Sequence, residues 1–451
     1  MLAYYDVDRQ EAMPLLAESI VPNDDATQWT ITLPEGAEFG NGDPLDAAAL
    51  VAHFDRHLGP ESTSRVRANA VQVIQSWEAV DDRSVTVTLH YSYPRFANLL
   101  AGDVGMVQNV ALINARGEAF GTDPAGAGAG PYEIVEYSPP ERIVFEAKDD
   151  WWGGPVCIER VVYEFIPDLR ANYDAFRKGE IDAVLLARDP AVINEARAEY
   201  PHAVSQMFNG AFFTMPNAGL GHTADVRVRQ AMAYAIDAEV INQRAWGGEG
   251  WSGKGVVLED SITLDATDGL PYDPERARQL LDEYKAETGW DGSIRGIAAN
   301  TPASNQEAAL AIAAMLNAVG FNVDANVDLP INDLITQVAI DKNFELVLSW
   351  GIIQPEPALW NGLRTWASDN PANQNGFSSP AFDAAMVALR SADSQAEYQA
   401  ALEQTQQVVN DEVPFIAYGG DLSTFVYDPA IKGARLHMNE TLILDTAYLE
   451  S

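Results

Sequence analysis

The sequence predicts an α/β protein that combines a parallel sheet with a separate region rich in β-strands. The chain has 451 residues, which is enough for two or three domains. Residues 294–349 read as a β-α-β-α-β run, the pattern of a parallel sheet covered by helices. Residues 25–150 read mostly as strands, and a glycine cluster at 247–255 separates two regions of α/β texture. These observations together favour two lobes joined near the glycine cluster.

The strand-rich region is identified by residues that alternate between apolar and polar. Strands are expected at 29–33, 84–89, 132–137 and 142–146, the last two as a hairpin around Pro139 and Pro140. One helix, at about 46–58, interrupts them. From residue 160 the texture changes to alternating strand and helix: a strand at 160–166, a helix at 170–178, a strand at 181–184 and one helix over 225–246.

The region after the glycine cluster carries the clearest pattern. Asp273 caps a helix that starts at Pro274 and ends at Gly289. The elements that follow are a strand at 294–299, a helix at 304–318, a strand at 321–327, a helix at 332–340, a strand at 344–349, helices at 379–391 and 395–410, and a strand at 413–418. Ligands of parallel sheets bind beyond the carboxyl ends of the strands, and Trp350 stands at such an end.

Composition excludes several classes of function. The 28 basic and 66 acidic residues give a formal charge of −38, the wrong sign for wrapping nucleic acid. This charge fits either a salt-rich or exported setting or an ordinary acidic surface. Cys157 is the single cysteine, so no internal disulfide forms, and the six histidines lack metal-binding spacing. We therefore expect no metal and no cofactor.

Two glycine-rich segments resemble nucleotide-binding loops but lack the required context. Gly248–Lys254 has phosphate-loop spacing, yet Gly255 replaces the Ser or Thr that would bind the metal. Gly126–Tyr132 leads through Pro131 into a strand rather than a helix. No set of residues in the sequence has the spacing of a known catalytic site. Aromatic residues at loop and strand ends are the stronger candidates for a site: Trp246, Trp251, Trp350, Trp360, Trp366 and Tyr418.

Several segments, in order along nearly the whole chain, resemble the solute-binding proteins of ABC importers, specifically the oligopeptide, dipeptide and nickel-binding family, family 5. Trp29–Leu45 is similar to that family's W-T-F-x-L-R-x-G-V-x-F-x-D-G-x-P-L, and Tyr173–Asp182 to its F-x-x-G-E-I-D. Asp225–Asp237 is very similar to D-V-R-V-R-Q-A-L-A-Y-A-I-D. The shorter matches are Pro14–Ser19, Gly128–Tyr132, Tyr272–Ala277 and Ser378–Asp383.

The resemblance implies a two-lobe periplasmic-binding-protein-like fold of type II with an extra β-rich sublobe. Lobe one is expected over 1–250, with the sublobe at about 20–150, and it is expected to be incomplete at its N-terminus. Lobe two is expected over 255–413, and 414–451 returns to lobe one. The expected hinge residues are Gly247, Gly255 and Pro414. The expected ligand-binding residues are Trp350, Ile353, Tyr418, Phe212, Thr214 and Gln354, with no catalytic residue.

The resemblance also implies the function: capture of a small solute and its delivery to ABC permease subunits in the membrane. Peptide binders of the family carry an aspartate where this chain has Ile353, so the solute is either peptide-like or oligosaccharide-like. The alternative is a secreted hydrolase of oligosaccharides or peptides. We expect a monomer that is periplasmic or extracellular, either anchored as a lipoprotein or soluble, although no signal segment stands in this sequence.

Overall fold

The computed structural model describes residues 1–6, 9–64, 66–166, 168–187, 189–201, 205–259, 261, 264–353, 359–437 and 441–450. The chain divides into two compact units. The first contains Met1–Leu185, Tyr200–Val204 and Phe425–Ser451, and the second contains Leu186–Glu199 and Ser205–Thr424. The boundaries between these units do not coincide with the lobe boundaries expected near residues 250 and 414, which both lie inside the second unit. The expected lobes therefore stay a prediction.

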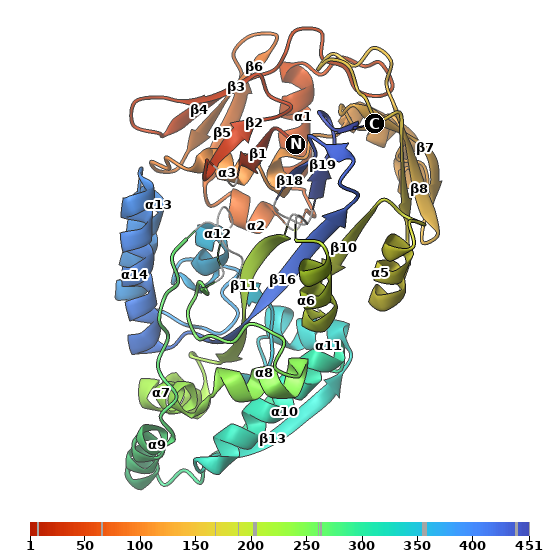
Figure 1. The fold of residues 1–451 in the computed structure, drawn as a ribbon. Helices are drawn as coiled ribbons and strands as arrows, with labels where there is room; N and C mark the ends of the chain where they lie inside the picture. Colours follow the sequence, from red (N-terminus) through yellow and green to blue (C-terminus); the bar gives the residue numbers. More distant parts are fainter. Residues whose placement is uncertain are drawn as a thin grey trace. The chain divides into compact units, whose positions relative to one another are not determined.

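The first unit consists mainly of antiparallel strands with a few short helices (Figure 1). Its strands are β1 (Ala3–Asp6), β2 (Glu11–Pro14), β3 (Ser19–Pro22), β4 (Gln28–Thr32), β5 (Ile74–Ala79), β6 (Ser84–Leu89), β7 (Tyr132–Ser138), β8 (Arg142–Ala147), β9 (Arg160–Glu164), β17 (Ile431–Lys432), β18 (Arg435–His437), β19 (Thr441–Ile443) and β20 (Tyr448–Leu449). Its helices are α1 (Ala47–Leu58), α2 (Arg67–Ala70), α3 (Phe96–Leu100), α4 (Val110–Arg116) and α5 (Leu169–Arg177).

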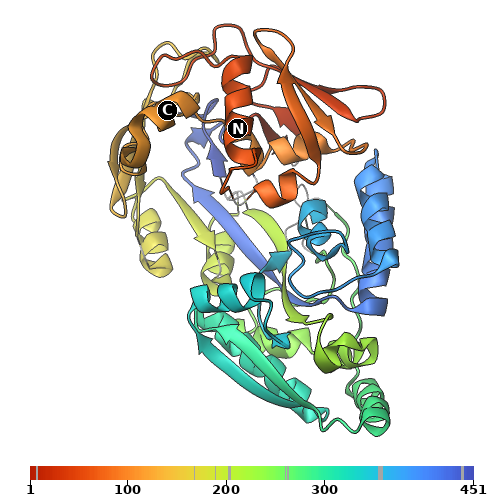
Figure 2. The same cartoon turned by 180° about the vertical axis from the view of Figure 1, so that it is seen from behind.

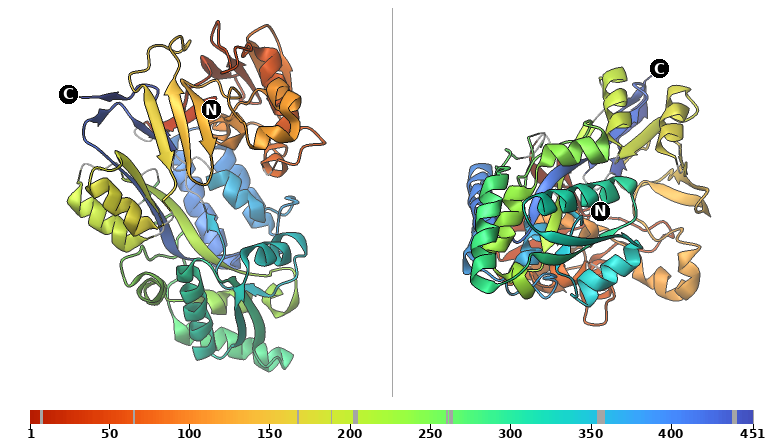
Figure 3. Two further views of the ribbon diagram at one scale, coloured as in Figure 1. Left: turned by 90° about the vertical axis from the view of Figure 1, so that its right-hand side faces the viewer. Right: turned by 90° about the horizontal axis from the view of Figure 1, so that it is seen from below.

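The expected strand-rich region is present in this unit. A four-stranded antiparallel sheet has the order β3-β4-β6-β5, and α1 contacts β5 and β6 with its buried face. Asp46 caps α1, because its side chain accepts a hydrogen bond from the Ala49 N–H. The expected hairpin is also present: β7 and β8 pair across Pro139 and Pro140, and β9 completes a three-stranded sheet (Figure 3, left).

The second unit holds most of a mixed sheet and the helices around it (Figures 1 and 2). Its helices are α6 (Pro190–Glu199), α7 (Val226–Ala235), α8 (Ala238–Trp246), α9 (Pro274–Thr288), α10 (Ala303–Ala318), α11 (Ile331–Ile335), α12 (Leu359–Leu363), α13 (Pro380–Ser391) and α14 (Gln395–Glu412). Its strands are β11 (Ser205–Pro216), β12 (Ser293–Ala299), β13 (Asn322–Leu329), β14 (Leu346–Val347) and β15 (Ile352–Ile353). The unit boundary falls within β10 (Ala183–Ala187) and β16 (Ile416–Tyr427).

The sheet order is β10-β16-β11-β14-β12-β13, with β15 paired to β11. The pairs β12–β13 and β12–β14 are parallel, which confirms the parallel sheet expected from the β-α-β-α-β run. β11 runs antiparallel to β14, β15 and β16. Apolar residues of α7, α8, α9 and α10 pack with those of β12 and β14 into one core. This packing fixes the edge at which the three parallel strands end.

Two expected helices differ from the structure. The helix expected over 225–246 is two helices, α7 and α8, because the Asp237 side chain accepts hydrogen bonds from the N–H groups of Glu239 and Val240 and so starts a new helix. The helix expected at 332–340 begins as α11 and continues as a π-helical turn, Thr336–Ile340. The strand expected at 344–349 is shorter, since only β14 pairs with its neighbours.

Candidate functional site

Trp350 lies just beyond β14, at the edge of the sheet where β12 and β13 also end. Its backbone N–H donates to the Phe213 carbonyl oxygen at 2.9 Å, which fixes the loop after β14 against β11. The side chain is partly exposed and lines two cavities of the second unit. This is the position at which α/β sheets bind ligands.

The first cavity, which we call the tryptophan cavity, has a volume of about 180 Å³. Four aromatic side chains contribute to its wall: Phe212, Trp246, Trp251 and Trp350. Ser304, Asn305 and Asp421 supply polar groups, with Ser304 and Asn305 lying in the first turn of α10. Walls that are mostly apolar, with several aromatic side chains and a few polar groups, are the usual composition of a small-molecule site.

The pairing of β11 with β16 places the groups of the tryptophan cavity. Phe212 lies opposite Gly419, and its ring stacks on Trp246 with centroids 5.5 Å apart. Gly210 lies opposite Asp421, so these two residues share the sheet face of Phe212. A Cβ added at Gly210 would lie 1.5 Å from Cγ2 of Ile352, so only glycine leaves room for this wall of the cavity.

The second cavity, which we call the β15 cavity, has a volume of about 190 Å³ and shares Trp350, Gly351 and Ile352 with the first. Its other walls include Phe213, Ile353 and Trp366, with Gln374 as a polar group. Ile353 is 2% exposed and offers no charge there. Trp350 therefore lines both cavities, and of their described lining residues only Asp421, in the tryptophan cavity, is charged.

Two of the expected binding residues are buried beside the cavities and are not among their described lining residues. The Tyr418 hydroxyl forms a 2.8 Å hydrogen bond with Ser349 Oγ, and burial raises the Tyr418 pKa above its usual range. The Thr214 hydroxyl donates to the Val347 carbonyl oxygen at 2.6 Å. Both side chains link neighbouring strands. Gln354, the remaining candidate, lies outside the described residues.

Sequence reasoning missed Asp421. The strand expected at 413–418 stopped short of it, whereas β16 continues to Tyr427. The Gly-Gly-Asp order at 419–421 is a weak signal, since glycines in a strand often mark a close approach of another group. Among the other aromatic candidates, Trp246 and Trp251 line the tryptophan cavity and Trp366 lines the β15 cavity. Trp360 is a core residue whose Nε1 donates to the Met386 carbonyl oxygen at 3.0 Å.

The three expected hinge residues lie within the second unit. Gly247 ends α8 in a left-handed conformation, with φ +63°. Gly255 packs against backbone, since an added Cβ would lie 1.8 Å from the Thr267 carbonyl oxygen. Pro414 follows Val413, which is also left-handed at φ 50°, and its carbonyl accepts from the Asn375 amide at 2.8 Å.

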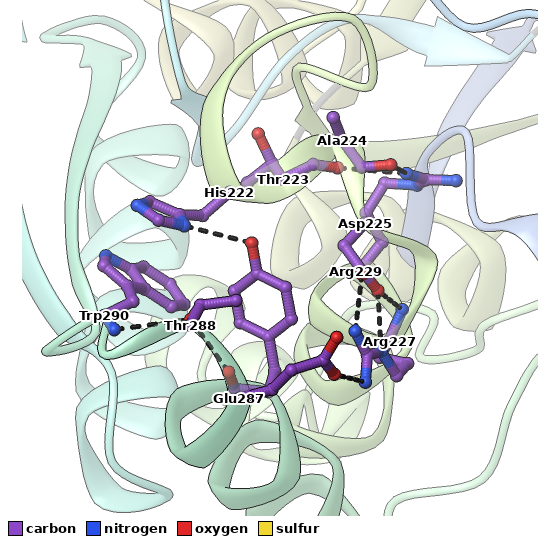
Figure 4. Close-up of polar contacts among 10 residues, drawn as sticks. His222, Thr223, Ala224, Asp225, Arg227, Arg229, Glu287, Thr288 and Trp290 are labelled. Atoms are coloured by element: carbon purple, nitrogen blue, oxygen red, sulfur yellow. Dashed lines mark hydrogen bonds and ion pairs between the residues drawn. The ribbon is translucent and has the colours of Figure 1, made fainter.

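The Asp-Val-Arg-Val-Arg segment at 225–229 has a structural role (Figure 4). Asp225 caps α7 and pairs with Arg227, which lowers the pKa of Asp225. Arg227 also pairs with Glu287 at 2.7 Å. The buried Arg229 donates hydrogen bonds to four carbonyl oxygens, those of Thr223, Ala224, Glu412 and Val413. Arg229 thus ties α7 to the end of α14.

Two kinds of feature were sought among the described residues, clusters of metal-ligating side chains and membrane-spanning helices. No group of three or more His, Cys, Asp or Glu side chains in the described ranges is arranged to hold a metal ion. Of the helices in the same ranges, none combines the length and apolar character that a membrane crossing requires.

Comparison with known proteins gives a family and a fold. Residues 11–374 match the family model described as bacterial extracellular solute-binding proteins, family 5 middle region. Heme-binding protein A of Haemophilus influenzae is 23% identical, over 93% of this chain and 81% of that protein. The glutathione-binding protein GsiB of Escherichia coli is 26% identical, over 62% of this chain and 54% of that protein.

Among solved structures, Haemophilus influenzae OppA in complex with the peptide RPPGFSPFR has a TM-score of 0.77. It is 18% identical and covers 100% of this chain and 92% of its own. This likeness confirms the α/β fold of two-lobe, type II binding proteins.

Proposed function

Because this chain belongs to the bacterial extracellular solute-binding proteins of family 5, we propose that the tryptophan cavity and the β15 cavity hold its solute. The chain has the role of the substrate-binding component that delivers a solute to an ABC transporter. The observation that carries the proposed site is the position of Trp350. Its side chain lines both cavities at the carboxyl edge of the parallel strands, where ligands of such sheets bind.

The proposed solute is peptide-like or oligosaccharide-like. Relatives bear names that refer to glutathione and heme, and one similar structure holds a peptide. The resemblance implies a carboxylate for the peptide α-ammonium group at the position of Ile353, which is apolar and 2% exposed. An ammonium buried there without a partner costs several kcal/mol. The solute therefore either stacks an uncharged group on Trp350 or places its amine elsewhere.

Delivery depends on closure of two lobes around the solute, and the proposed lobes are 1–250 with 414–451, and 255–413. The proposed hinge residues are Gly247, Gly255 and Pro414. Closure requires a solute that binds the closed state more tightly than the open state. We further propose a monomer that works in the periplasm or outside the cell, either lipid-anchored or soluble, and that binds its solute without chemical change.

The test is titration with candidate solutes, in which tryptophan fluorescence and calorimetry measure binding. Di- to pentapeptides, their N-acetylated forms and oligosaccharides are the solutes to compare. Trp350→Phe should abolish most of the fluorescence change and weaken binding. Trp77→Phe, a change in β5 of the first unit, should do neither. Binding and fluorescence that are unchanged in Trp350→Phe would overturn the proposed site, and release of product from any solute would favour the hydrolase alternative.

A further inference from the structure

Gly351 occupies the middle of the short segment that the two proposed solute cavities share. Among their described lining residues, the tryptophan cavity and the β15 cavity have Trp350, Gly351 and Ile352 in common. The Trp350 N–H donates to the Phe213 carbonyl oxygen at 2.9 Å. Ile352 lies opposite Phe212 in the pairing of β15 with β11. Strand β11 therefore fixes both ends of the segment, and its middle residue borders both cavities.

The fold does not require glycine at position 351. A Cβ added to Gly351 would meet no heavy atom of the described residues within 4 Å, its two chain neighbours aside. Its φ lies outside the left-handed region, so a residue with a side chain can adopt the same backbone conformation. Gly210 differs, because Ile352 occupies the space that its Cβ would need. The space beside the exposed Gly351 is therefore open to a solute.

Each cavity has room for about one ring. The volumes are about 180 Å³ for the tryptophan cavity and about 190 Å³ for the β15 cavity. An engineered apolar cavity of about 150 Å³ in another protein binds benzene. A solute with two ring-sized groups therefore needs both cavities, and its groups must connect across the segment that the cavities share. Gly351 is the one residue of that segment without a side chain.

The walls of the β15 cavity favour an uncharged ring that forms few hydrogen bonds. Phe213 and Trp366 meet edge to face there, with ring centroids 5.4 Å apart. The polar side chains among its described lining residues are those of Thr365 and Gln374, and none of these lining residues is charged. A sugar ring carries several hydroxyls, and each one that is buried without a partner costs free energy. The cavity therefore favours the aromatic side chain of a peptide over a sugar.

We propose that Gly351 is a specificity-determining residue: the open space at its Cβ position lets one peptide-like solute place an aromatic group in each cavity at the same time. This inference rests on the proposed function, because it concerns the same two cavities. It names the preferred solute as a short peptide that has two ring-bearing side chains and is uncharged where the cavities hold it. Ile353, which also lines the β15 cavity, agrees with an uncharged solute.

The direct test compares N-acetyl-Phe-Tyr-amide with N-acetyl-Phe-Ala-amide and N-acetyl-Ala-Tyr-amide, which have the same backbone and one ring each. Calorimetry on the unmodified 451-residue chain should show the two-ring peptide binding at least about tenfold more tightly than either one-ring peptide, because it buries a second aromatic side chain. Equal affinities of the three peptides, or no binding of any of them, would overturn the inference. This comparison needs no variant to fold.

Substitutions at Gly351 then assign the preference to this position. Gly351→Val should lower the affinity of the two-ring peptide about tenfold, to that of the one-ring peptides, because its side chain occupies the space between the cavities. Gly351→Ala should lower it by a smaller factor, about threefold. The one-ring peptides need one cavity and should bind both variants as they bind the unmodified chain. Melting temperatures close to that of the unmodified chain confirm that both variants fold.

The matched control is Gly121→Val. Gly121 is an exposed glycine of the first unit, and a Cβ there also meets no described atom within 4 Å. This substitution should change none of the three affinities. Affinity for the two-ring peptide that is equal in Gly351→Val and in the unmodified chain contradicts the inference.

The outcomes separate this inference from the proposed function. Peptides that bind tightly and depend on Trp350, but bind Gly351→Val unchanged, would overturn the role of Gly351 and leave the proposed solute site standing. Peptide affinities that Trp350→Phe leaves unchanged would overturn the proposed site and this inference with it. A preference for two rings that is lost in Gly351→Val and weakened in Trp350→Phe supports both.

Discussion

His437 links three segments of the first unit through the two nitrogens of one buried ring. Its Nδ1 accepts a hydrogen bond from the Tyr5 N–H at 3.3 Å, and its Nε2 lies 2.8 Å from the Ala101 carbonyl oxygen. These partners assign the proton to Nε2 and leave the ring neutral. His53 has the same arrangement: the Gln108 N–H donates to Nδ1, and Nε2 lies 3.0 Å from the Val104 carbonyl oxygen. Both rings resist protonation because they are buried.

Stability should fall as the pH drops from about 6.5 towards 4. Burial lowers the pKa of His53 and of His437 to about 4, whereas each has a pKa near 6.5 in the unfolded chain. Between these pH values the unfolded state binds more protons than the native state. Each histidine therefore lowers the free energy of unfolding by up to ~1.4 kcal/mol for each unit by which the pH falls. The contribution is constant above pH 6.5. Urea unfolding at pH 7, 6 and 5 measures the slope.

His437→Gln is the variant that isolates this effect, because an amide can donate to Ala101 but does not titrate. The variant should be less stable at pH 7 yet lose less stability between pH 7 and 5. His90→Gln, at an exposed position, should keep the slope of the unmodified chain. A slope that is the same in all three proteins would show that buried histidines do not govern the pH response.

Position 210 requires glycine because the Ile352 side chain occupies the space that a Cβ would need. In Gly210→Ala the new methyl group would overlap Ile352, and β15 must move to relieve the contact. We expect a loss of about 1–3 kcal/mol in the free energy of unfolding, together with weaker solute binding. Gly351→Ala is the matched control, because a Cβ there meets no atom within 4 Å. Denaturant unfolding of both variants and solute titration of Gly210→Ala check this, since Gly351 itself lines both cavities and is a control for stability alone. Equal stabilities of the two variants would contradict it.

At the scale of elements, Arg229 connects α7 to the C-terminal end of α14. Arg229→Met removes the donors to four carbonyl oxygens and should lower the free energy of unfolding by about 2–4 kcal/mol. Arg229→Lys should restore only part of this, since an ammonium group cannot reach both pairs of carbonyls. Arg227→Met, at the exposed ion pair beside it, should cost much less. Denaturant unfolding that ranks Arg227→Met as the more damaging change would refute this role.

Elements with strong local signals could be predicted from the sequence. The strand at 84–89 coincides with β6, and Asp273, Pro274 and Gly289 mark the ends of α9 as expected. The break at Ile236 was missed because the apolar pattern continues through it: Ala235 and Ile236 are both buried. Only the Asp237 cap distinguishes two helices from one, and a single Asp within an apolar pattern is a weak signal.

The candidate site could be predicted only where one residue carries the signal. Trp350 was found because it follows a strand of a recognisable parallel run. Asp421 was not found, since its position depends on the pairing of β16 with β11, more than 200 residues earlier in the chain. The burial of Tyr418 and Thr214 depends on the same long-range packing, and a sequence pattern gives an alternation of faces but not the depth of each side chain.

At the scale of the whole molecule, the excess of negative charge is the main influence on stability that the sequence indicates. The 66 acidic residues exceed the 28 basic ones, and ion pairs with a basic group therefore neutralise a minority of the carboxylates. Mutual repulsion of the excess charges disfavours the compact state, and the unfolded chain relieves it by expanding. Dissolved salt weakens this repulsion, because the Debye length falls from about 30 Å at 0.01 M to about 3 Å at 1 M.

The melting temperature should therefore rise with NaCl, steeply at low concentration and less above a few tenths molar, where screening is nearly complete. Calorimetric scans from 0.01 to 1 M NaCl measure the curve, and KCl should reproduce it, since screening depends on ionic strength rather than on the cation. Sucrose at equal osmolarity is the control, because it stabilises by exclusion from the protein surface without screening charge. A further rise between 1 and 3 M would favour the salt-rich setting over an ordinary acidic surface. A melting temperature that is flat from 0.01 to 1 M would mean that the carboxylates are spaced widely enough for water alone to screen them, and the repulsion argument would fail.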